Sequence, residues 1–311
     1  MSDLELSLIS SLHFENNLSQ QEIAKRLGLS KMTISRLLQK AKETGVVDIR
    51  VRSPFFFNNA LGKEIEDKYE IEKAIIIKKS IDEELSGADL IASAYAYHLS
   101  LSQLEDHVLG IGGGDTIGKV VSHLVAIHTK SLHIVQLIGG LSNVYYKNPL
   151  TIMQELCRKF DAQGTYLTSF ATVENEEIRD SIFNSSMGTT ILKMWDTCDE
   201  ALFGIGSIGK GTFLSPDLIQ ANEFKTLEER GAWGDILGHC FDLKGNFIET
   251  DLEKRLVSIP LQMLKKIPKR VALAVGDYKV NAIHGALLTN IITAFISDED
   301  TVKKLLQKQF R

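Results

Sequence analysis

One segment of the chain combines cations and short polar side chains in a pattern suited to DNA. Between Ile23 and Lys42 there are six basic residues and no acidic one. Cations neutralise phosphates, and polar side chains at the start of a helix can reach base edges in the major groove. We predict base-edge contacts from Lys31, Thr33, Ser35 and Arg36, and phosphate contacts from Gln20, Gln21 and Lys40.

A second set of residues could bind a small ligand. Several apolar runs end in glycine, which lets backbone N–H groups approach an anion closely, and a helix start adds positive potential there. Asp235 could accept protons from ligand hydroxyls, and Lys279 could face an anionic group. The predicted ligand residues are Gly114, Asp115, Thr116, Gly139, Gly140, Asp235 and Lys279.

Both predictions have simpler alternatives. The basic segment could be a helical hairpin with a solvated face, or a module that pairs with other helices. Each glycine turn could connect a strand to a helix without binding anything, and each charge could lie on a surface loop.

The residue pattern indicates neither an enzyme active site nor a metal site. We see no Ser-His-Asp order, no nucleophile elbow and no paired carboxylates at a telling spacing, so no catalytic residue is predicted. The run from Gly110 to Lys119 is neither a Walker loop nor a proper GxGxxG, so no nucleotide cofactor is expected. Three distant cysteines and scattered histidines predict no metal site. Asp196, Asp199 and Glu200 resemble a solvated turn.

The DNA-contacting residues require a pair of short helices to position them. Ser19 and Glu22 form a capping-box signature, Gly28 can end the first helix, and Ser30 can cap the second. An amphipathic first helix is expected before the pair, and a strand or wing is expected at 46–51. Apolar residues predicted to face inward in the pair are Ile23, Ala24, Leu27, Ile34, Leu37, Leu38 and Ala41.

The remaining chain alternates between helix and strand patterns. Helices are expected at 60–69, 86–104, 116–128, 150–161, 175–193, 278–288 and 298–309. Apolar strands are expected at 74–77, 108–111, 132–137, 201–205, 271–275 and 291–295. Strands that are apolar throughout and separated by helices predict a mostly parallel α/β sheet covered on both faces.

Length and charge predict two domains with different tasks. We place a helix-turn-helix domain at 1–53, a junction at 54–59 and a ligand-binding α/β domain at 60–311. Phe55 to Phe57 are too apolar for a free linker and should dock on the body or on a neighbouring subunit. The net charge of the whole chain is −5, so the chain as a whole is not a general polyanion binder. The excess of basic residues is confined to the first domain. We find neither a signal-peptide pattern nor a membrane span, and expect a cytoplasmic protein.

Taken together, the chain resembles the SorC/DeoR-type family of bacterial sugar-responsive transcriptional regulators. The segments that carry the resemblance are SQQEIAKRLGLSKMTISRLLQKAKETGVVDIRV, GIGGGDTIGK, QLIGGLSN, ALFGIGSIG, GAWGDILGHCFDLKGN and VGDYKVNAIHGAL. The resemblance implies a Rossmann-like body related to sugar-phosphate isomerases, used for sensing. It also implies a sugar or phosphorylated-sugar effector, operator DNA as a partner, and a homodimer or homotetramer. Family effector contacts map onto the seven ligand residues named above.

Three departures from the family pattern bear on the effector. Many members have a basic or hydroxyl residue where this chain has Asp115, and some have a lysine where it has Ile138. A covalent link to an aldehyde sugar is therefore not expected. Thr168 to Phe170 replace a more proline-rich stretch. The leading hypothesis is a DNA-binding regulator controlled by a sugar-type ligand, and the alternative is a sugar-phosphate isomerase or deaminase with a helical appendage.

Overall fold

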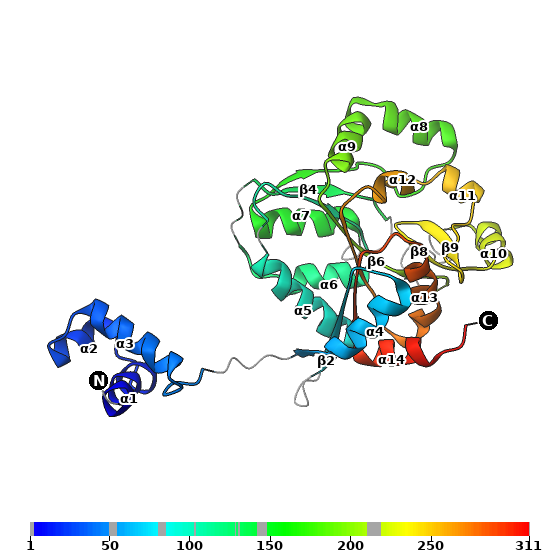
Figure 1. Cartoon of the computed structure of the whole chain (residues 1–311). Helices are drawn as coiled ribbons and strands as arrows, with labels where there is room; N and C mark the ends of the chain where they lie inside the picture. The colour runs from blue at the N-terminus through cyan, green and yellow to red at the C-terminus, as the bar shows by residue number, and fades with distance from the viewer. Residues whose placement is uncertain are drawn as a thin grey trace. The chain divides into compact units, whose positions relative to one another are not determined.

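A computed structural model describes residues 3–49, 55–79, 85–102, 104–127, 129, 131–141, 148–209 and 219–310. The chain divides into two compact units, Met1–Ser53 and Pro54–Arg311. Figure 1 shows the elements of each unit along the chain.

The first unit consists of short helices whose ends are fixed by their own caps. These are α1 (Asp3–Ser10), a π-helical turn (Ser11–Glu15), α2 (Gln20–Leu27) and α3 (Lys31–Glu43). The Ser19 hydroxyl accepts the Glu22 N–H, and the Glu22 carboxylate accepts the Ser19 N–H at 2.8 Å. Gly28 closes α2 with φ 68°, and the Ser30 hydroxyl accepts the Thr33 N–H at 3.0 Å. The predicted capping box, helix stop and second cap are confirmed.

A small apolar core holds these helices together. Its buried residues are Leu6, Ile9, Ile23, Ala24, Ile34, Leu37, Leu38 and Ala41. The predicted inward face of α3 is therefore confirmed, whereas Leu27 is exposed at the end of α2. Val46 and Val47 pack against this core, but no strand forms at 46–49. The rest of the expected strand or wing, 50–51, lies outside the described residues.

The second unit is built on an eight-stranded sheet with the order β1-β2-β11-β10-β6-β3-β4-β5. Every neighbouring pair from β2 to β5 is parallel, and only the edge strand β1 is antiparallel. The predicted α/β class with a mostly parallel sheet is confirmed. The strands are β1 (Phe55–Phe57), β2 (Lys73–Lys79), β3 (Val108–Ile111), β4 (His133–Gln136), β5 (Gln163–Thr165), β6 (Glu200–Gly204), β10 (Lys269–Leu273) and β11 (Ala294–Asp298).

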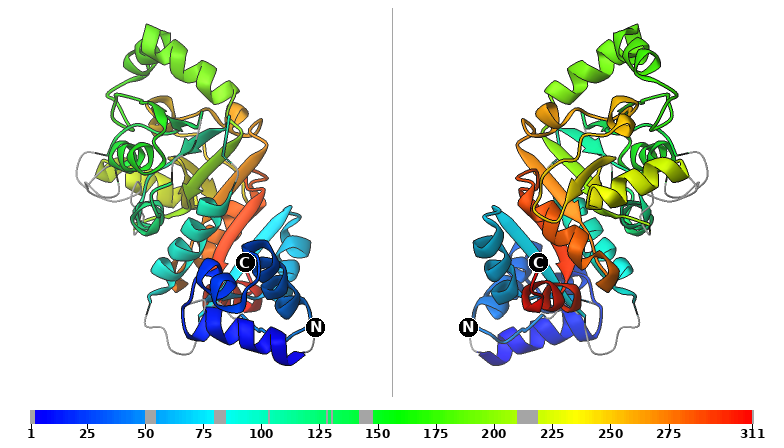
Figure 2. Two further views of the ribbon diagram at one scale, coloured as in Figure 1. Left: turned by 90° about the vertical axis from the view of Figure 1, so that its left-hand side faces the viewer. Right: turned by 90° about the vertical axis from the view of Figure 1, so that its right-hand side faces the viewer.

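Helices cover both faces of this sheet, as Figure 2 shows from two sides. One face packs against α5 (Gly87–Leu101), α6 (Asp115–His123) and α7 (Pro149–Phe160). The other packs against α4 (Asn59–Tyr69), α9 (Ser186–Asp196), α13 (Val280–Leu288) and α14 (Glu299–Gln307). Successive residues of one strand enter different cores: Leu202 of β6 faces α5 and α6, while Phe203 faces the opposite side.

A smaller antiparallel sheet stands beside the main one. Its strands are β7 (Gly206–Ser207), β8 (Ala232–Ile236) and β9 (His239–Asp242), in that order. Short helices accompany it: α10 (Ala221–Glu229), α11 (Asp251–Lys254) and α12 (Leu261–Leu264). The sequence pattern did not predict these three helices.

Several element boundaries differ from the sequence expectations. The helix expected at 175–193 is two helices, α8 (Glu176–Asn184) and α9, because the Ser185 hydroxyl caps the second at the Gly188 N–H. The last strand begins at Ala294, three residues later than expected. Phe55 to Phe57 dock as β1, in register with Lys79 to Ile77 of β2.

The interpretation of Asp196, Asp199 and Glu200 as a solvated turn is wrong for Glu200. This side chain is 3% exposed and accepts hydrogen bonds from the Tyr95 hydroxyl at 2.7 Å and the Lys269 ammonium at 2.9 Å. Since both partners come from distant parts of the chain, local sequence could not reveal the pairing. Among the described residues, none of the helices combines the length and apolar character that a membrane span needs.

Candidate functional site

The strand order of the main sheet reverses between β3 and β6. From β3 the chain adds β4 and β5 on one side, and then β6, β10 and β11 on the other. In open parallel sheets, ligands bind at the carboxyl ends of the strands on either side of such a reversal. The loop after β3 and the end of β6 lie close together here, because a methyl group on Gly204 would be 4.0 Å from the Gly113 carbonyl oxygen.

Three of the predicted ligand residues lie at the end of β3. Gly114 has φ 105°, a conformation that suits glycine, and it precedes the first turn of α6. Asp115 begins that helix and is half-buried, while Thr116 is buried. A backbone turn followed by a helix start gives this corner the N–H groups and the positive potential that a polar ligand needs.

Asp235 lies in β8, opposite Gly206 of β7. The side chain is 5% exposed, and its Oδ2 accepts the Gly238 N–H at 3.0 Å. Its Oδ1 is buried without a hydrogen-bond partner among the described residues. A methyl group on Gly206 would overlap Oδ1, so the glycine makes room for this oxygen. An unsatisfied buried oxygen carries a cost and requires an explanation, and a ligand hydroxyl would provide one.

Burial raises the pKa of Asp235 to about 6, although the Gly238 N–H, Lys279 and His239 oppose the rise. Desolvation disfavours the charged form more strongly than these neighbours favour it. A carboxyl whose pKa is raised by burial, next to a lysine that acts to lower it, is typical of a functional site.

Lys279 lies near Asp235. It ends a short 3-10 helix (Asp277–Lys279) after β10 and donates its Nζ to the Ile205 carbonyl at 2.8 Å. Ile205 directly precedes Gly206, which makes room for the Asp235 carboxylate. The sequence predicts Asp235 and Lys279 in one ligand site, and the structure brings them close together at the end of β6.

Gly139 and Gly140 follow β4, but their backbone is already in use. The Gly139 N–H donates to the Val257 carbonyl at 2.9 Å, and the Gly140 N–H donates to the Ser169 carbonyl at 2.7 Å. Neither N–H is therefore available to an anion in this structure. The space beside Gly139 is filled by the Phe170 carbonyl, whereas a methyl group on Gly140 would meet only ordinary contacts at 3.5 Å. The following Ser142 and Asn143 lie outside the described residues.

In the first unit, part of the predicted DNA surface forms one groove. Gln20, Ser35 and Arg36 line a groove of about 390 Å³ together with His13, Phe14, Leu38, Gln39 and Lys42. Gln21, Lys31 and Lys40 are exposed. Thr33 differs, because it is half-buried and its hydroxyl lies 2.8 Å from the Ser30 hydroxyl. The predicted contact of Thr33 with base edges stays a prediction, and the Thr33 hydroxyl is already engaged with Ser30.

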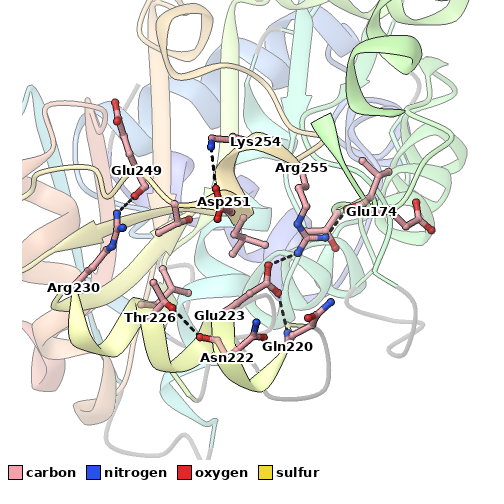
Figure 3. Close-up of a pocket in the computed structure, with 15 residues that line it drawn as sticks. Glu174, Gln220, Asn222, Glu223, Thr226, Arg230, Glu249, Asp251, Lys254 and Arg255 are labelled. Carbon is pink, nitrogen blue, oxygen red and sulfur yellow. Dashed lines mark hydrogen bonds and ion pairs between the residues drawn. The ribbon is translucent and has the colours of Figure 1, made fainter. Parts of the chain in front are cut away.

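Another groove lies elsewhere in the second unit, between α10, α11 and residues 172–174 (Figure 3). Its volume is about 760 Å³, and none of the predicted ligand residues lines it. Several of its charged side chains already have partners: the Arg255 guanidinium bonds to the Glu223 carboxylate and, at 2.6 Å, to the Val173 carbonyl. Lys254 pairs with Asp251 at 3.0 Å. Arg255, Glu223, Lys254 and Asp251 are thus already paired, and we assign no ligand to this groove.

Comparison with known proteins covers both units. Residues 53–307 match the Sugar-bind family, described as "Putative sugar-binding domain", and residues 1–54 match the MarR_2 profile of the MarR family. The deoxyribonucleoside regulator of Bacillus subtilis is 30% identical over 300 residues, with 95% of each chain covered. The sorbitol operon regulator of Klebsiella pneumoniae is 28% identical over 309 residues, with 96% of each chain covered.

A solved structure is similar over the whole length. The full-length sorbitol operon regulator SorC from Klebsiella pneumoniae has a TM-score of 0.75 at 25% identity, covering 99% of this chain and 100% of its own. The similarity therefore includes the order of the two units as well as the fold of each.

Proposed function

The chain belongs to the SorC/DeoR-type family of sugar-responsive transcriptional regulators, and from this premise we propose that a sugar-type effector controls its binding to an operator. The family and these relatives are regulators and not enzymes, so the isomerase alternative is set aside. The observation that carries the effector part is the buried Oδ1 of Asp235, unpartnered among the described residues, beside Lys279.

The DNA contact is assigned to the outer face of α3 and to the start of α2. Lys31, Thr33, Ser35 and Arg36 would contact base edges. The Thr33 hydroxyl lies against the Ser30 hydroxyl, which restricts the contact that this residue can make. Gln20, Gln21 and Lys40 would contact phosphates, which fixes the orientation of the helix without selecting a sequence.

The effector site is assigned to the carboxyl ends of β3, β4, β6 and β10. Asp235 would accept hydrogen bonds from ligand hydroxyls, and Lys279 would face an anionic or electron-rich group. Gly114 and Thr116 would present the start of α6, with Asp115 holding a further hydroxyl. The effector contacts of Gly139 and Gly140 stay a prediction: the Phe170 carbonyl already fills the space beside Gly139, so any room for the ligand would lie beside Gly140. This chemistry fits a sugar, free or phosphorylated.

Coupling between the two units would work through subunit arrangement. We propose a homodimer or homotetramer whose subunits present two or more first units to one operator. An effector that prefers one arrangement shifts the population towards it, and so changes the spacing of the helices that contact DNA.

Two experiments test the two parts separately. Selection from a random duplex library with the full chain should enrich one sequence, with affinity that falls steeply with salt. The absence of enrichment, or binding indifferent to salt, would refute the DNA part.

A thermal-shift screen of free and phosphorylated sugars tests the effector part. A ligand at a hundred times its Kd should stabilise the second unit by about 2.7 kcal/mol. Asp235→Ala should abolish the shift, and a shift that survives this change would place the site elsewhere. Turnover of a sugar phosphate by the purified chain would restore the enzyme alternative.

A further inference from the structure

We propose that Met32 contacts the methyl group of a thymine in the major groove and thereby selects one base pair of the operator. This inference rests on the proposed function, because it requires α3 to lie on DNA. It adds a sequence-selecting residue of a different chemical type from the polar and cationic side chains already assigned.

The first observation is the position of Met32 on the helix. All thirteen residues of α3 are described, and its other large apolar side chains, Ile34, Leu37 and Leu38, are buried in the core of the first unit. Met32 is 72% exposed. Since the inward face is already complete without it, packing within the first unit does not account for the methionine.

The second observation concerns the side chains that share one face of α3 with Met32. Residues spaced by three or four lie on one face of a helix, so Met32, Ser35, Arg36 and Gln39 form a single outward row. The last three of these line the groove described above. Met32 is therefore at the N-terminal end of the row that carries the predicted base contacts, and recognition helices contact bases with this end.

The third observation removes the neighbouring candidate for this role. Thr33 could also offer a methyl group, but its hydroxyl lies against Ser30 and its backbone N–H donates to the same cap. The cap holds Thr33 half-buried at the helix start. Met32 has no such restraint from the described contacts, and its Cα–Cβ bond is tilted towards the helix start, as in any α-helix.

The chemistry then identifies the target. In the major groove each base edge presents hydrogen-bond donors or acceptors, and the C5-methyl group of thymine is the apolar exception. A thioether side chain cannot satisfy donors or acceptors well, but it is flexible and polarisable and packs readily on an apolar group. A lone exposed methionine is unremarkable on an ordinary surface. On the row that faces base edges, thymine is the partner it suits.

The test is a uracil scan of the selected operator. Each thymine is replaced in turn by deoxyuridine, which removes only the methyl group, and affinity is measured for the wild-type chain and for Met32→Ala. Wild type should lose about fourfold at one thymine of each half-site, as expected for one buried methyl group. Met32→Ala should show no loss at that position and a normal profile elsewhere.

Two further variants serve as controls. Met32→Leu should retain most of the effect, because leucine keeps an apolar side chain at the same place. Leu8→Ala removes another exposed apolar side chain, from α1, and should leave the scan unchanged.

The possible outcomes distinguish failure of the Met32 contact from failure of DNA binding itself. A scan that is flat in wild type, or identical in Met32→Ala, would overturn the role of Met32 while DNA binding stands. So would a uniform loss of affinity with a change of oligomeric state, which would identify a subunit contact instead. If no duplex is enriched at all, the proposed function fails and this inference fails with it.

Discussion

Replacing Asp235 with asparagine should make the second unit more stable at alkaline pH while abolishing effector binding. Burial raises the pKa of this carboxyl from 3.8 to about 6 in the folded chain. A rise of this size corresponds to about 3 kcal/mol of unfavourable free energy for the ionised form. Asparagine keeps an oxygen for the Gly238 N–H but cannot ionise.

The sign of the pH dependence follows from which state binds the proton more tightly. Between about pH 4 and pH 7 the folded chain retains the Asp235 proton that the unfolded chain releases, so folding becomes less favourable as pH rises. Wild type should therefore lose about 3 kcal/mol relative to Asp235→Asn across this window. At pH 8 the variant should be more stable by about 1–2 kcal/mol, after about 1 kcal/mol is deducted for a weaker bond to Gly238 and an unpaired amide.

Urea unfolding followed by tryptophan fluorescence measures this difference, because both tryptophans, Trp195 and Trp233, belong to the second unit. The unfolding free energies of wild type and Asp235→Asn are compared at several pH values from 4 to 8. Asp106→Asn serves as the control, because it removes an exposed negative charge from the same unit and leaves the buried Asp235 carboxyl in place. Parallel pH curves for wild type and Asp235→Asn would refute the reasoning, as would an effector that binds both equally.

Three further predictions test other parts of the structure. Gly139→Ala would overlap the Phe170 carbonyl and should lower the free energy of unfolding by about 1–3 kcal/mol, whereas Gly140→Ala, with its nearest neighbours at 3.5 Å, should be nearly neutral in the same urea titration. Equal effects would contradict the close packing of the Phe170 carbonyl against Gly139. Ser19→Ala should destabilise the first unit by about 1 kcal/mol, seen as faster hydrogen exchange in α2, and unchanged exchange would mean that the cap is not needed. Lys40→Ala should weaken binding to all duplexes alike and reduce the salt slope by about 0.9, and a loss confined to one sequence would instead indicate a base contact.

Local chemistry in the sequence was sufficient to predict the helix pair of the first unit. Ser19 with Glu22, Gly28 and Ser30 act on backbone groups within one turn of themselves, so their effect does not depend on the rest of the fold. The alternation of apolar runs with helical patterns likewise predicted a parallel sheet, because burial on both faces imposes that composition on each strand.

Element boundaries and short elements were harder to predict. The break at Ser185 between α8 and α9, and the helices α10 to α12, depend on caps and packing that a periodic pattern does not contain. Phe55 to Phe57 were correctly predicted to dock, but only the pairing with β2 identified them as the sheet edge.

The sequence by itself determined which residue types this protein offers to DNA and to a ligand, and the order in which they occur. Tertiary structure decided which of those groups are available. It engages the N–H groups of Gly139 and Gly140 with distant carbonyls, buries Glu200 against Tyr95 and Lys269, and leaves Oδ1 of Asp235 without a described partner at the end of β6. The physical reason is that a hydrogen-bond partner or a desolvated charge depends on residues far away in the chain, whereas caps and hydrophobic periodicity act between neighbours.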